Sequence, residues 1–511
     1  MLGSRARAMS NSSDNPLLRR WGESRRPPRR SLPRWIWSLL AVSAVAALGL
    51  VLWLVGRSGP WRSPSGQPHF ASCTYGGYVD AWCTRLRVSE DPRTPNGPMI
   101  SLRIAVLPAT KRPAAGALFY LEGGPGGAAT AAAIRVNNFF AEVQRNRDLV
   151  MVDQRGTGGS RRLACPNGYV RRADATAVTG YLRRCLARLD ADPRLYTTSV
   201  AADDLEIVRR TLGYGKIDLF GGSYGATLAQ AYVRRYPESV RSLVLDGGSL
   251  PDVRIYDVSA RNAERALDAQ LARCAAAPAC ARAYPHPRRQ LDELLARPPR
   301  RVAVAAAVGK VLLGPDDIAW TVDLLSETVE NAALIPFAVN AAAHGDYTTL
   351  ATTYANRLGA SNLEALARLV PFWIILCSEP WAAFDPAATA RAGRGSYLAE
   401  AAVARARLFR HACAVAPKGR VPTDAASRPV VRLPTLLLAG GADPLDPTAN
   451  LRGWQRLFPR GHLIVVPSAG HGTLEYACVQ KLIARFVEHA SATWLNASCV
   501  RHAPLPPFIT G

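Results

Sequence analysis

Short apolar runs alternate with helical patterns through much of this chain of 511 residues. The runs have the length of strands, and several are continuously apolar, as parallel strands buried on both faces are. They cover residues 101–108, 117–124, 148–156, 216–222 and 240–248. Helical spacing of apolar residues follows at 201–213 and 226–237. Strand and helix in turn predict a mostly parallel sheet with helices on both faces, an α/β fold.

The alternation is interrupted between residues 250 and 430. That stretch is rich in Ala and Arg, mostly helical in pattern and short of strand signals. Strand patterns return at 434–444 and 462–472, and helical patterns accompany them around 451–457 and 475–489. We therefore predict one sheet domain with a helical insertion placed before its last two strands.

An uncharged stretch of 21 residues at 35–55 precedes the globular pattern. As a helix it spans roughly 30 Å, the thickness of the hydrocarbon core of a bilayer. Trp residues lie near both of its ends, and nine arginines stand in residues 1–34. These features predict a transmembrane anchor with a cytoplasmic N-terminus and an extracytoplasmic globular part. The alternative is a signal peptide cleaved near 44–46, which would release a secreted protein.

The predicted organisation divides the chain into consecutive segments. They are a basic cytoplasmic tail (1–34), an anchor (35–55), a linker rich in Gly, Pro and Ser (56–70), the first part of the sheet domain (71–249), the helical insertion (250–430), the C-terminal part of the sheet domain (431–495) and a tail (496–511).

The cysteines bear on the compartment in which the globular part lies. There are ten, all of them after the uncharged stretch, and none forms a CxxC pair. An even number in this position favours an oxidising compartment and up to five disulfides. Sequence leaves the connectivity open, although the neighbours Cys73–Cys83 and Cys478–Cys499 make the simplest pairs. Buried free thiols are the alternative.

The net charge of the chain gives little information about its binding partners. The net charge is +24, but 58 of the 63 basic residues are arginines, a bias that base composition of the gene also produces. The globular part has neither zinc-finger spacing nor a block of basic residues, so we predict no nucleic-acid partner. No metal or organic cofactor is expected, and the oligomeric state is left open.

The motif GGSYG at 221–225 lies between an apolar strand and an amphipathic helix. Glycines on both sides of Ser223 allow a tight turn that holds the hydroxyl on an exposed, strained elbow. The N-terminus of the following helix adds positive potential beside it. This arrangement is typical of a nucleophilic serine, and a plain strand–helix turn is the alternative.

A serine nucleophile needs a base, and the base needs an orienting carboxylate. Asp443 and His471 each follow a predicted strand, at the sheet edge where Ser223 also lies. They stand in the order serine, acid, histidine that this architecture uses. Asp446 is the alternative acid, and we expect whichever aspartate is not used to cap the helix after Pro447.

The loop EGGPGG at 122–127 supplies candidate donors for an oxyanion. Its glycines let backbone N–H groups approach a substrate closely. The expected donors are the N–H groups of Gly124 and Tyr224, the second being the residue after the nucleophile. A Gly-Pro turn with no chemical role is the alternative.

These motifs together resemble the α/β-hydrolase fold and, more narrowly, the proline iminopeptidase and tripeptidyl aminopeptidase family of serine exopeptidases. The resemblance covers about residues 70 to 490. It rests on GGPGG (123–127), DQRGTGGS (153–160), the block 203–237, VLDGG (244–248), CSE (377–379), GGADP (440–444) and AGHG (469–472).

The resemblance implies Ser223 as nucleophile, Asp443 as orienting acid, His471 as general base, and the insertion as a lid over the site. It also implies removal of short peptides from a free amino end. Binding that amine needs a carboxylate near the lid, and Glu379 is our candidate because it lies in the insertion close to a cysteine that could fix it; a solvated or capping glutamate is the alternative. Glu122 stands where iminopeptidases commonly have histidine, which weakens a proline-specific interpretation.

We therefore predict an extracytoplasmic serine hydrolase that acts on short peptides as an aminopeptidase through an acyl-enzyme. Two alternatives differ in class. One keeps the three side chains but acts on small esters or amides, and the other is a catalytically silent protein of this fold that binds a partner.

Overall fold

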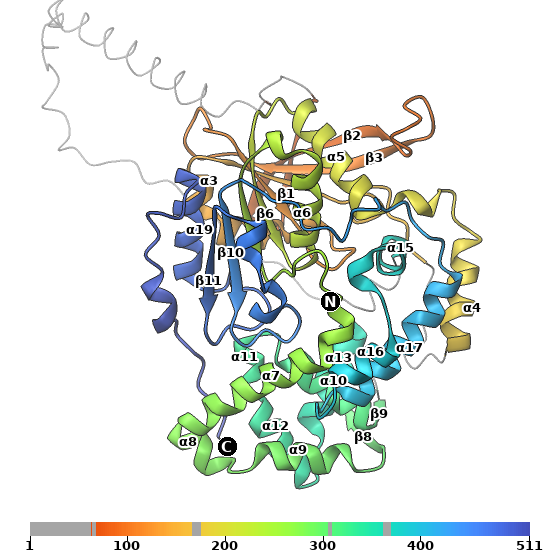
Figure 1. Ribbon diagram of the computed structural model, residues 1–511, viewed down its shortest axis with the longest axis vertical. Helices are drawn as coiled ribbons and strands as arrows, with labels where there is room; N and C mark the ends of the chain where they lie inside the picture. The colour runs from red at the N-terminus through yellow and green to blue at the C-terminus, as the bar shows by residue number, and fades with distance from the viewer. Residues whose placement is uncertain (1–62, 64–67, 166–174, 305–308, 361–368, 511) are drawn as a thin grey trace, which may run out of the picture. The chain divides into compact units, whose positions relative to one another are not determined.

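A nine-stranded sheet organises the computed structural model, which describes residues 63, 68–165, 175–304, 309–360 and 369–510 (Figure 1). The strand order is β1-β2-β3-β5-β4-β6-β7-β10-β11. The strands are β1 (Ala71–Tyr75), β2 (Val79–Ser89), β3 (Met99–Leu107), β4 (Ala117–Leu121), β5 (Asp148–Val152), β6 (Ile217–Gly222), β7 (Val240–Asp246), β10 (Thr435–Gly440) and β11 (Gly461–Val466).

The sheet is parallel from β5 to β11 and antiparallel from β1 to β5. All seven strands expected from the apolar runs are confirmed, and the parallel part has the predicted helices beside it. The sequence pattern missed β1 and β2. Strand β2 carries charged and half-exposed residues for most of its length, so it lacks the continuous apolar run of a buried strand.

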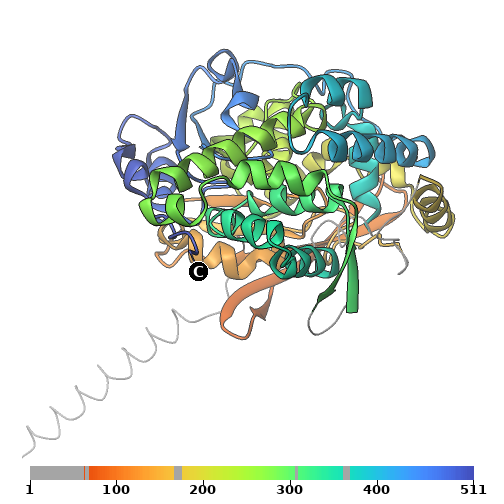
Figure 2. The same cartoon turned by 90° about the horizontal axis from the view of Figure 1, so that it is seen from below.

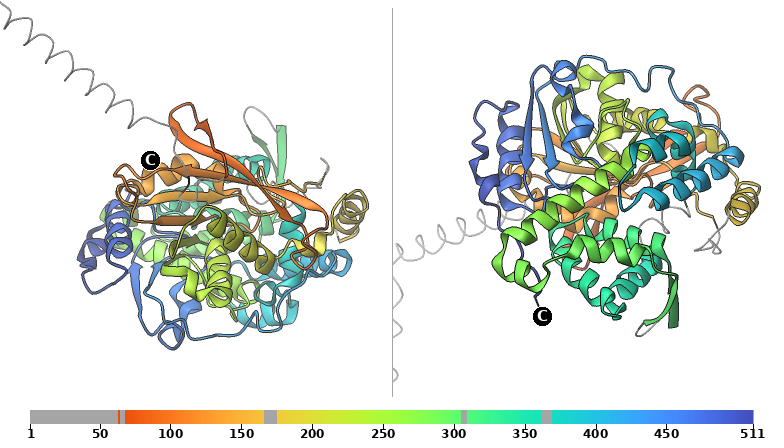
Figure 3. Two further views of the ribbon diagram at one scale, coloured as in Figure 1. Left: turned by 90° about the horizontal axis from the view of Figure 1, so that it is seen from above. Right: turned by 60° about the horizontal axis from the view of Figure 1, so that its bottom comes forward.

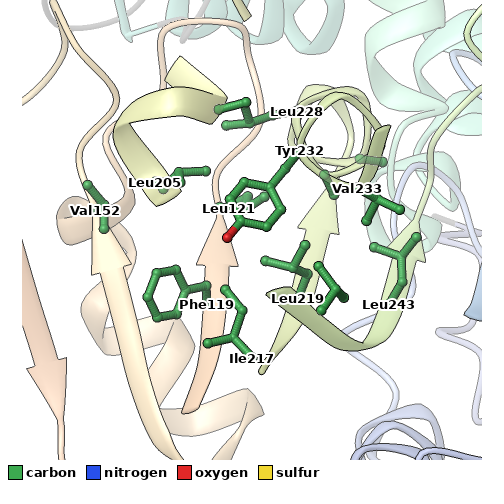
Figure 4. Close-up of a cluster of buried hydrophobic side chains, with 14 of the residues drawn as sticks. Phe119, Leu121, Val152, Leu205, Ile217, Leu219, Leu228, Tyr232, Val233 and Leu243 are labelled. Carbon is green, nitrogen blue, oxygen red and sulfur yellow. The ribbon is translucent and has the colours of Figure 1, made fainter. Parts of the chain in front are cut away.

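Helices cover both faces of the sheet, as predicted. On one face, α5 (Thr198–Thr211) and α6 (Tyr224–Arg235) pack on β4 and β6 (Figure 4). Phe119 and Leu219 from those strands lie beneath Tyr232 of α6, and all three side chains are buried. On the other face, α2 (Ala133–Phe139), α3 (Ala141–Gln144) and α19 (Ala477–His489) cover a second apolar cluster.

The segment between β7 and β10 is mostly helical (Figures 1, 2 and 3). Its described helices are α7 (Ile255–Ala276), α8 (Pro278–Ala283), α9 (Pro287–Leu295), α10 (Pro315–Leu325), α11 (Val329–Ala332), α12 (Ile335–Ala343), α13 (Thr348–Ala360), α15 (Val370–Ser378), α16 (Pro386–Ala392) and α17 (Ala399–Val415). The expectation of few strands holds except for one antiparallel hairpin of β8 (Arg300–Val304) and β9 (Gly309–Leu313), which the sequence pattern missed.

This insertion has its own apolar core. Side chains of α7, α9, α10, α12, α13 and α17 pack with the hairpin in one cluster. A second cluster joins α15 and α17 to Tyr224 of α6 and to α4 (Ala175–Leu186), which belongs to the chain before β6. The second cluster therefore ties the insertion to the part of the sheet domain that carries Ser223.

All ten cysteines form disulfides, which confirms the largest number that the count allowed. The pairs Cys73–Cys83 and Cys478–Cys499 are the two that sequence proximity predicted. The remaining pairs are Cys165–Cys185, Cys274–Cys280 and Cys377–Cys413. Each bridge is local, and the longest separation is 36 residues, between α15 and α17.

Within the described residues, no helix combines the length and apolarity needed to cross a bilayer. The predicted basic tail and the predicted anchor at 35–55 lie outside those residues.

Candidate active site

Ser223 occupies a strained turn between β6 and α6. Its φ is +54° and its ψ is −128°, a backbone conformation that non-glycine residues rarely adopt. The glycines on either side of Ser223 are required because a side chain at either position would overlap the backbone. A Cβ on Gly221 would overlap the carbonyl oxygen of Gly225, and a Cβ on Gly225 would overlap that of Leu121. The sharp elbow that the GGSYG motif predicted is present.

Asp443 and His471 form a hydrogen-bonded pair at the same edge of the sheet. The His471 Nδ1 atom lies 3.0 Å from one carboxylate oxygen of Asp443 and 3.2 Å from the other. Asp443 is 1% exposed and also accepts hydrogen bonds from the backbone N–H groups of Leu445 and Asp446. The carboxylate is therefore fixed, and it orients the imidazole with Nε2 as the remaining nitrogen.

The surroundings change the acidity of the imidazole. Burial lowers the pKa of His471, but the charge and hydrogen bond of Asp443 raise it by more, with smaller contributions from Asp446 and Glu327. The net pKa lies above the ordinary value of histidine. This environment stabilises the imidazolium form, which is the form produced when the ring accepts a proton.

Ser223 and His471 approach the same short segment of chain. The Ser223 N–H donates to the Asp246 carbonyl at 2.9 Å, and a Cβ on Gly247 would lie 3.4 Å from His471 Nδ1. Both side chains belong to the described residues, and no hydrogen bond joins the Ser223 hydroxyl to the imidazole there. Hydrogen bonds of this kind are often long in free enzymes and shorten when substrate binds.

Asp446 is not the hydrogen-bond partner of His471. Its carboxylate accepts a hydrogen bond from the Ser249 hydroxyl, and its backbone N–H donates to Asp443. The expected capping role is wrong, because the short helix η6 (Thr448–Leu451) has Pro447 at its N-cap and no side-chain cap. The Asp446 carboxylate pairs with the Ser249 hydroxyl instead.

The glycine loop lies against the turn that holds Ser223. A Cβ on Gly123 would be 3.1 Å from the Ser223 Cβ, so a side chain there would crowd the turn. Gly124 and Tyr224 line a small pocket of about 40 Å³ together with Ser223. Glu122 does not line this pocket: its carboxylate binds Arg135 at 2.6 Å and the Tyr120 hydroxyl at 3.1 Å, and it accepts the Gly123 N–H at 3.1 Å.

A larger cavity of about 400 Å³ adjoins this pocket. The two share Thr227, Pro251 and Trp381 in their walls. Glu379 lines the larger cavity, is 7% exposed and accepts a hydrogen bond from the backbone N–H of Thr198 at 3.2 Å. Burial raises its pKa. The solvated alternative for Glu379 is therefore wrong, while the contact with the first residue of α5 is a capping contact.

Two charged residues of the DQRGTGGS motif, Asp153 and Arg155, brace loops. Asp153 accepts hydrogen bonds from the backbone and hydroxyl of Thr130 and from the Gly159 N–H. Arg155 is fully buried and binds both carboxylate oxygens of Asp204 at 2.7 Å. Neither of them lines the pocket of Ser223.

Comparison with known proteins identifies the architecture that holds this site. The alpha/beta hydrolase fold family matches residues 116–477, which is most of the chain. The chain belongs to this family. An α/β hydrolase carries its functional residues on loops at the carboxyl ends of its strands, which is where Ser223, Asp443 and His471 lie.

Several named relatives of this α/β hydrolase are peptidases. Serine protease Hip1 of Mycobacterium tuberculosis is 28% identical over 262 residues, which are 46% of this chain and 50% of that protein. The tripeptidyl aminopeptidase of Streptomyces lividans is 31% identical over 185 residues, 32% of this chain and 34% of that protein. The proline iminopeptidase of Neisseria meningitidis serogroup B is 35% identical over 131 residues, 25% and 32% of the two chains.

The resemblance that the motifs indicated is thus confirmed by relatives that bear those names. The matches span half of these curated relatives or less. Sequence reasoning missed several residues around the site of the α/β hydrolase. Trp381 and Tyr256 of the insertion line the Ser223 pocket, and the Glu327 carbonyl accepts the His471 N–H at 2.6 Å. Only the three-dimensional contact reveals such residues, since none has a motif.

Proposed function

We propose that this α/β hydrolase is a serine peptidase that removes short peptides from a free amino end. Ser223 is the nucleophile, His471 the general base and Asp443 the carboxylate that orients it. The observation that carries the proposal is the buried Asp443–His471 hydrogen bond on the same sheet edge as the strained Ser223 turn. The three named relatives support a peptide substrate.

The reaction has two balanced steps. The Ser223 oxygen forms a bond to the carbonyl carbon while its proton passes to His471, and the C–N bond then breaks as the amine leaves with that proton. Water attacks the resulting ester, gives its proton to His471, and Ser223 regains a proton as the acid is released. The N–H groups of Gly124 and Tyr224 stabilise the oxyanion, and one such donor contributes about 3–4 kcal/mol.

Glu379 is the proposed site for the substrate amine. Its buried carboxylate lines a cavity that adjoins the Ser223 pocket, and that cavity has room for the amino-terminal part of a short peptide. An ammonium group would pair with the carboxylate and offset the cost of its burial. The insertion acts as a lid, a proposal supported by Trp381 and Tyr256 in the walls of the Ser223 pocket.

The proposed location is extracytoplasmic, with a single-pass anchor at 35–55. Five disulfides support an oxidising compartment, and the arginines before the anchor support a cytoplasmic N-terminus. Fractionation of cells followed by protease protection tests this. A protein released into the medium with a new N-terminus near residue 46 would indicate a cleaved signal peptide instead.

The experiment that tests the function combines a fluorophosphonate probe with peptide digestion. The probe phosphorus bonds to the Ser223 oxygen with loss of fluoride, so the wild-type protein is labelled at Ser223 and Ser223→Ala is not. Tripeptides and longer peptides with free amino ends should be trimmed, and N-acetylated versions should not. Turnover of aryl esters without any peptide cleavage would favour the esterase alternative. Absence of labelling would favour the silent binding protein.

The amine site has its own prediction. Glu379→Gln removes the negative charge but keeps the shape and the oxygen that accepts from Thr198, so folding should be preserved. We expect kcat/KM for free-amine peptides to fall about 10–100-fold, because a hydrogen bond to a charged group contributes about 1.5–3 kcal/mol. For an uncharged aryl ester, which has no ammonium group to bind the carboxylate, kcat/KM should change less than about twofold. Equal losses on both substrates would contradict the assignment.

A further inference from the structure

Asp246, the last residue of β7, makes a set of contacts that the proposed chemistry does not use. Its carboxylate is 3% exposed. One oxygen accepts the backbone N–H of Thr473 at 3.0 Å, and the other accepts the Thr473 hydroxyl at 2.9 Å. Thr473 lies two residues after His471, so this carboxylate fixes the loop that carries the imidazole.

The backbone around Asp246 reaches the other two functional loops. Its carbonyl accepts the Ser223 N–H at 2.9 Å, and the next N–H, that of Gly247, donates to Leu438 on β10, the strand that leads to Asp443. Gly247 has a φ of +57° and lies against the imidazole of His471. A single dipeptide thus contacts the nucleophile turn, the histidine loop and the strand before the acid.

Asp246 and His471 also interact through their charges. Burial raises the pKa of Asp246 to about 6, while the bonds from Thr473 and the charge of His471 act in the opposite direction and Asp443 raises it further. Both carboxylate oxygens accept hydrogen bonds from Thr473, which is the arrangement that suits the ionised form. An ionised oxygen accepts from both donors of Thr473, whereas an amide in its place would turn an N–H₂ group toward one of them.

We infer that Asp246 is a positioning residue that sets the separation between the Ser223 hydroxyl and the His471 ring. The inference rests on the proposed function. Asp246 touches no substrate; it acts by holding Ser223 through its carbonyl and His471 through Thr473. Since an error of about 1 Å in such a site can cost about 100-fold in rate, loss of this link should affect the chemical step more than substrate binding.

The test compares Asp246→Asn with a matched control, Asp218→Asn. Asp218 is a buried carboxylate near the start of β6, 1% exposed and paired with Arg147 and Arg241. We expect Asp246→Asn to lower kcat and the rate of Ser223 phosphonylation about 100-fold with little change in KM. Asp218→Asn should lower the melting temperature. Its kcat should be unchanged when the concentration of active sites is taken from labelling by the phosphonate probe.

Two Thr473 variants separate the link from general packing. Thr473→Val removes the hydroxyl donor but keeps the N–H donor and the shape, so the rate should fall by less than in Asp246→Asn. Thr473→Ser keeps both donors, so its rate should equal that of the wild-type protein. Equal rate losses in Asp246→Asn and Asp218→Asn, or full activity of Asp246→Asn, would overturn the inference.

An NMR measurement that needs no catalytic turnover tests the positioning role of Asp246 separately from the proposed function. The downfield imidazole N–H resonance of His471, assigned with His471→Asn, reports the Asp443 hydrogen bond even in an inactive protein. It should shift or broaden in Asp246→Asn and stay in place in Asp218→Asn. If wild-type Ser223 is not labelled but the resonance moves as expected, the proposed function fails and the positioning role stands. If the resonance is the same in both variants, the positioning role fails.

Discussion

At the scale of single residues, the site depends on charges that are held in fixed positions. Asp443 is bound by two backbone N–H groups as well as by His471, so its carboxylate cannot turn away from the ring. The imidazole carries a pKa above its ordinary value because of this neighbour. A base with a raised pKa is protonated, and inactive, up to a higher pH.

The raised pKa of His471 determines how the rate of labelling depends on pH. The rate of Ser223 phosphonylation should rise with pH and be lost as the pH falls through the raised pKa of His471. Asp443→Asn removes the charge that raises this pKa, so the acidic limb should move to lower pH while the maximal rate falls about 10⁴-fold. The profile is measured with the probe in constant-ionic-strength buffers. An acidic limb that stays in place in Asp443→Asn would show that another group controls it.

At the scale of elements, sequence reasoning succeeded where a loop follows a buried strand. The carboxyl ends of β6, β10 and β11 meet at one edge of the sheet, which is why the sequence pattern alone predicts that Ser223, Asp443 and His471 lie near one another. It failed for the half-exposed β1 and β2 and for the hairpin of β8 and β9, which lack continuous apolar runs.

Sequence reasoning also failed for contacts between elements far apart in the chain. Asp246 and Thr473 are separated by 227 residues, and nothing in either motif indicates that they meet. The same holds for Asp446, whose expected helix cap is replaced by the hydroxyl of Ser249. A pattern along one strand cannot show which side chain a neighbouring loop presents.

The loop before His471 gives an element-level prediction. A Cβ on Gly470 would overlap the Glu327 carbonyl, the same atom that accepts the His471 N–H. Gly470→Ala must therefore push the histidine loop away from the end of α10, and we expect kcat to fall about 100-fold or more. Gly215→Ala is the control, because a Cβ there meets no atom within 4 Å. Activity of Gly470→Ala within twofold of the control would contradict this contact.

At the scale of the whole molecule, the insertion is held internally by its own core and by the Cys377–Cys413 bridge. That bridge joins α15 to α17 two residues before Glu379. It therefore restrains the part of the insertion that carries the proposed amine site, in addition to stabilising the fold.

The bridge gives a prediction about stability. In the chain-entropy view, a loop of 36 residues corresponds to about 4 kcal/mol, and the six-residue loop of Cys274–Cys280 to about 2 kcal/mol. The double variant Cys377→Ser, Cys413→Ser should thus lower the free energy of unfolding more than Cys274→Ser, Cys280→Ser does. Urea denaturation of both proteins measures the difference. The first variant should also lose more kcat/KM on free-amine peptides; the reverse order in both measurements would contradict this reasoning.

The hydrogen bond from the His471 backbone to Glu327 has a practical consequence for anyone who redesigns the enzyme. Cutting out residues 255–415 to obtain a smaller, wide-open catalyst would also remove the carbonyl that accepts the backbone N–H of His471, the proposed general base. A truncated protein of that kind would keep Ser223 and Asp443 and still be a poor hydrolase. Entry of bulkier substrates is better sought by trimming Trp381, which lines the pocket of Ser223 and leaves the Glu327 carbonyl in the chain.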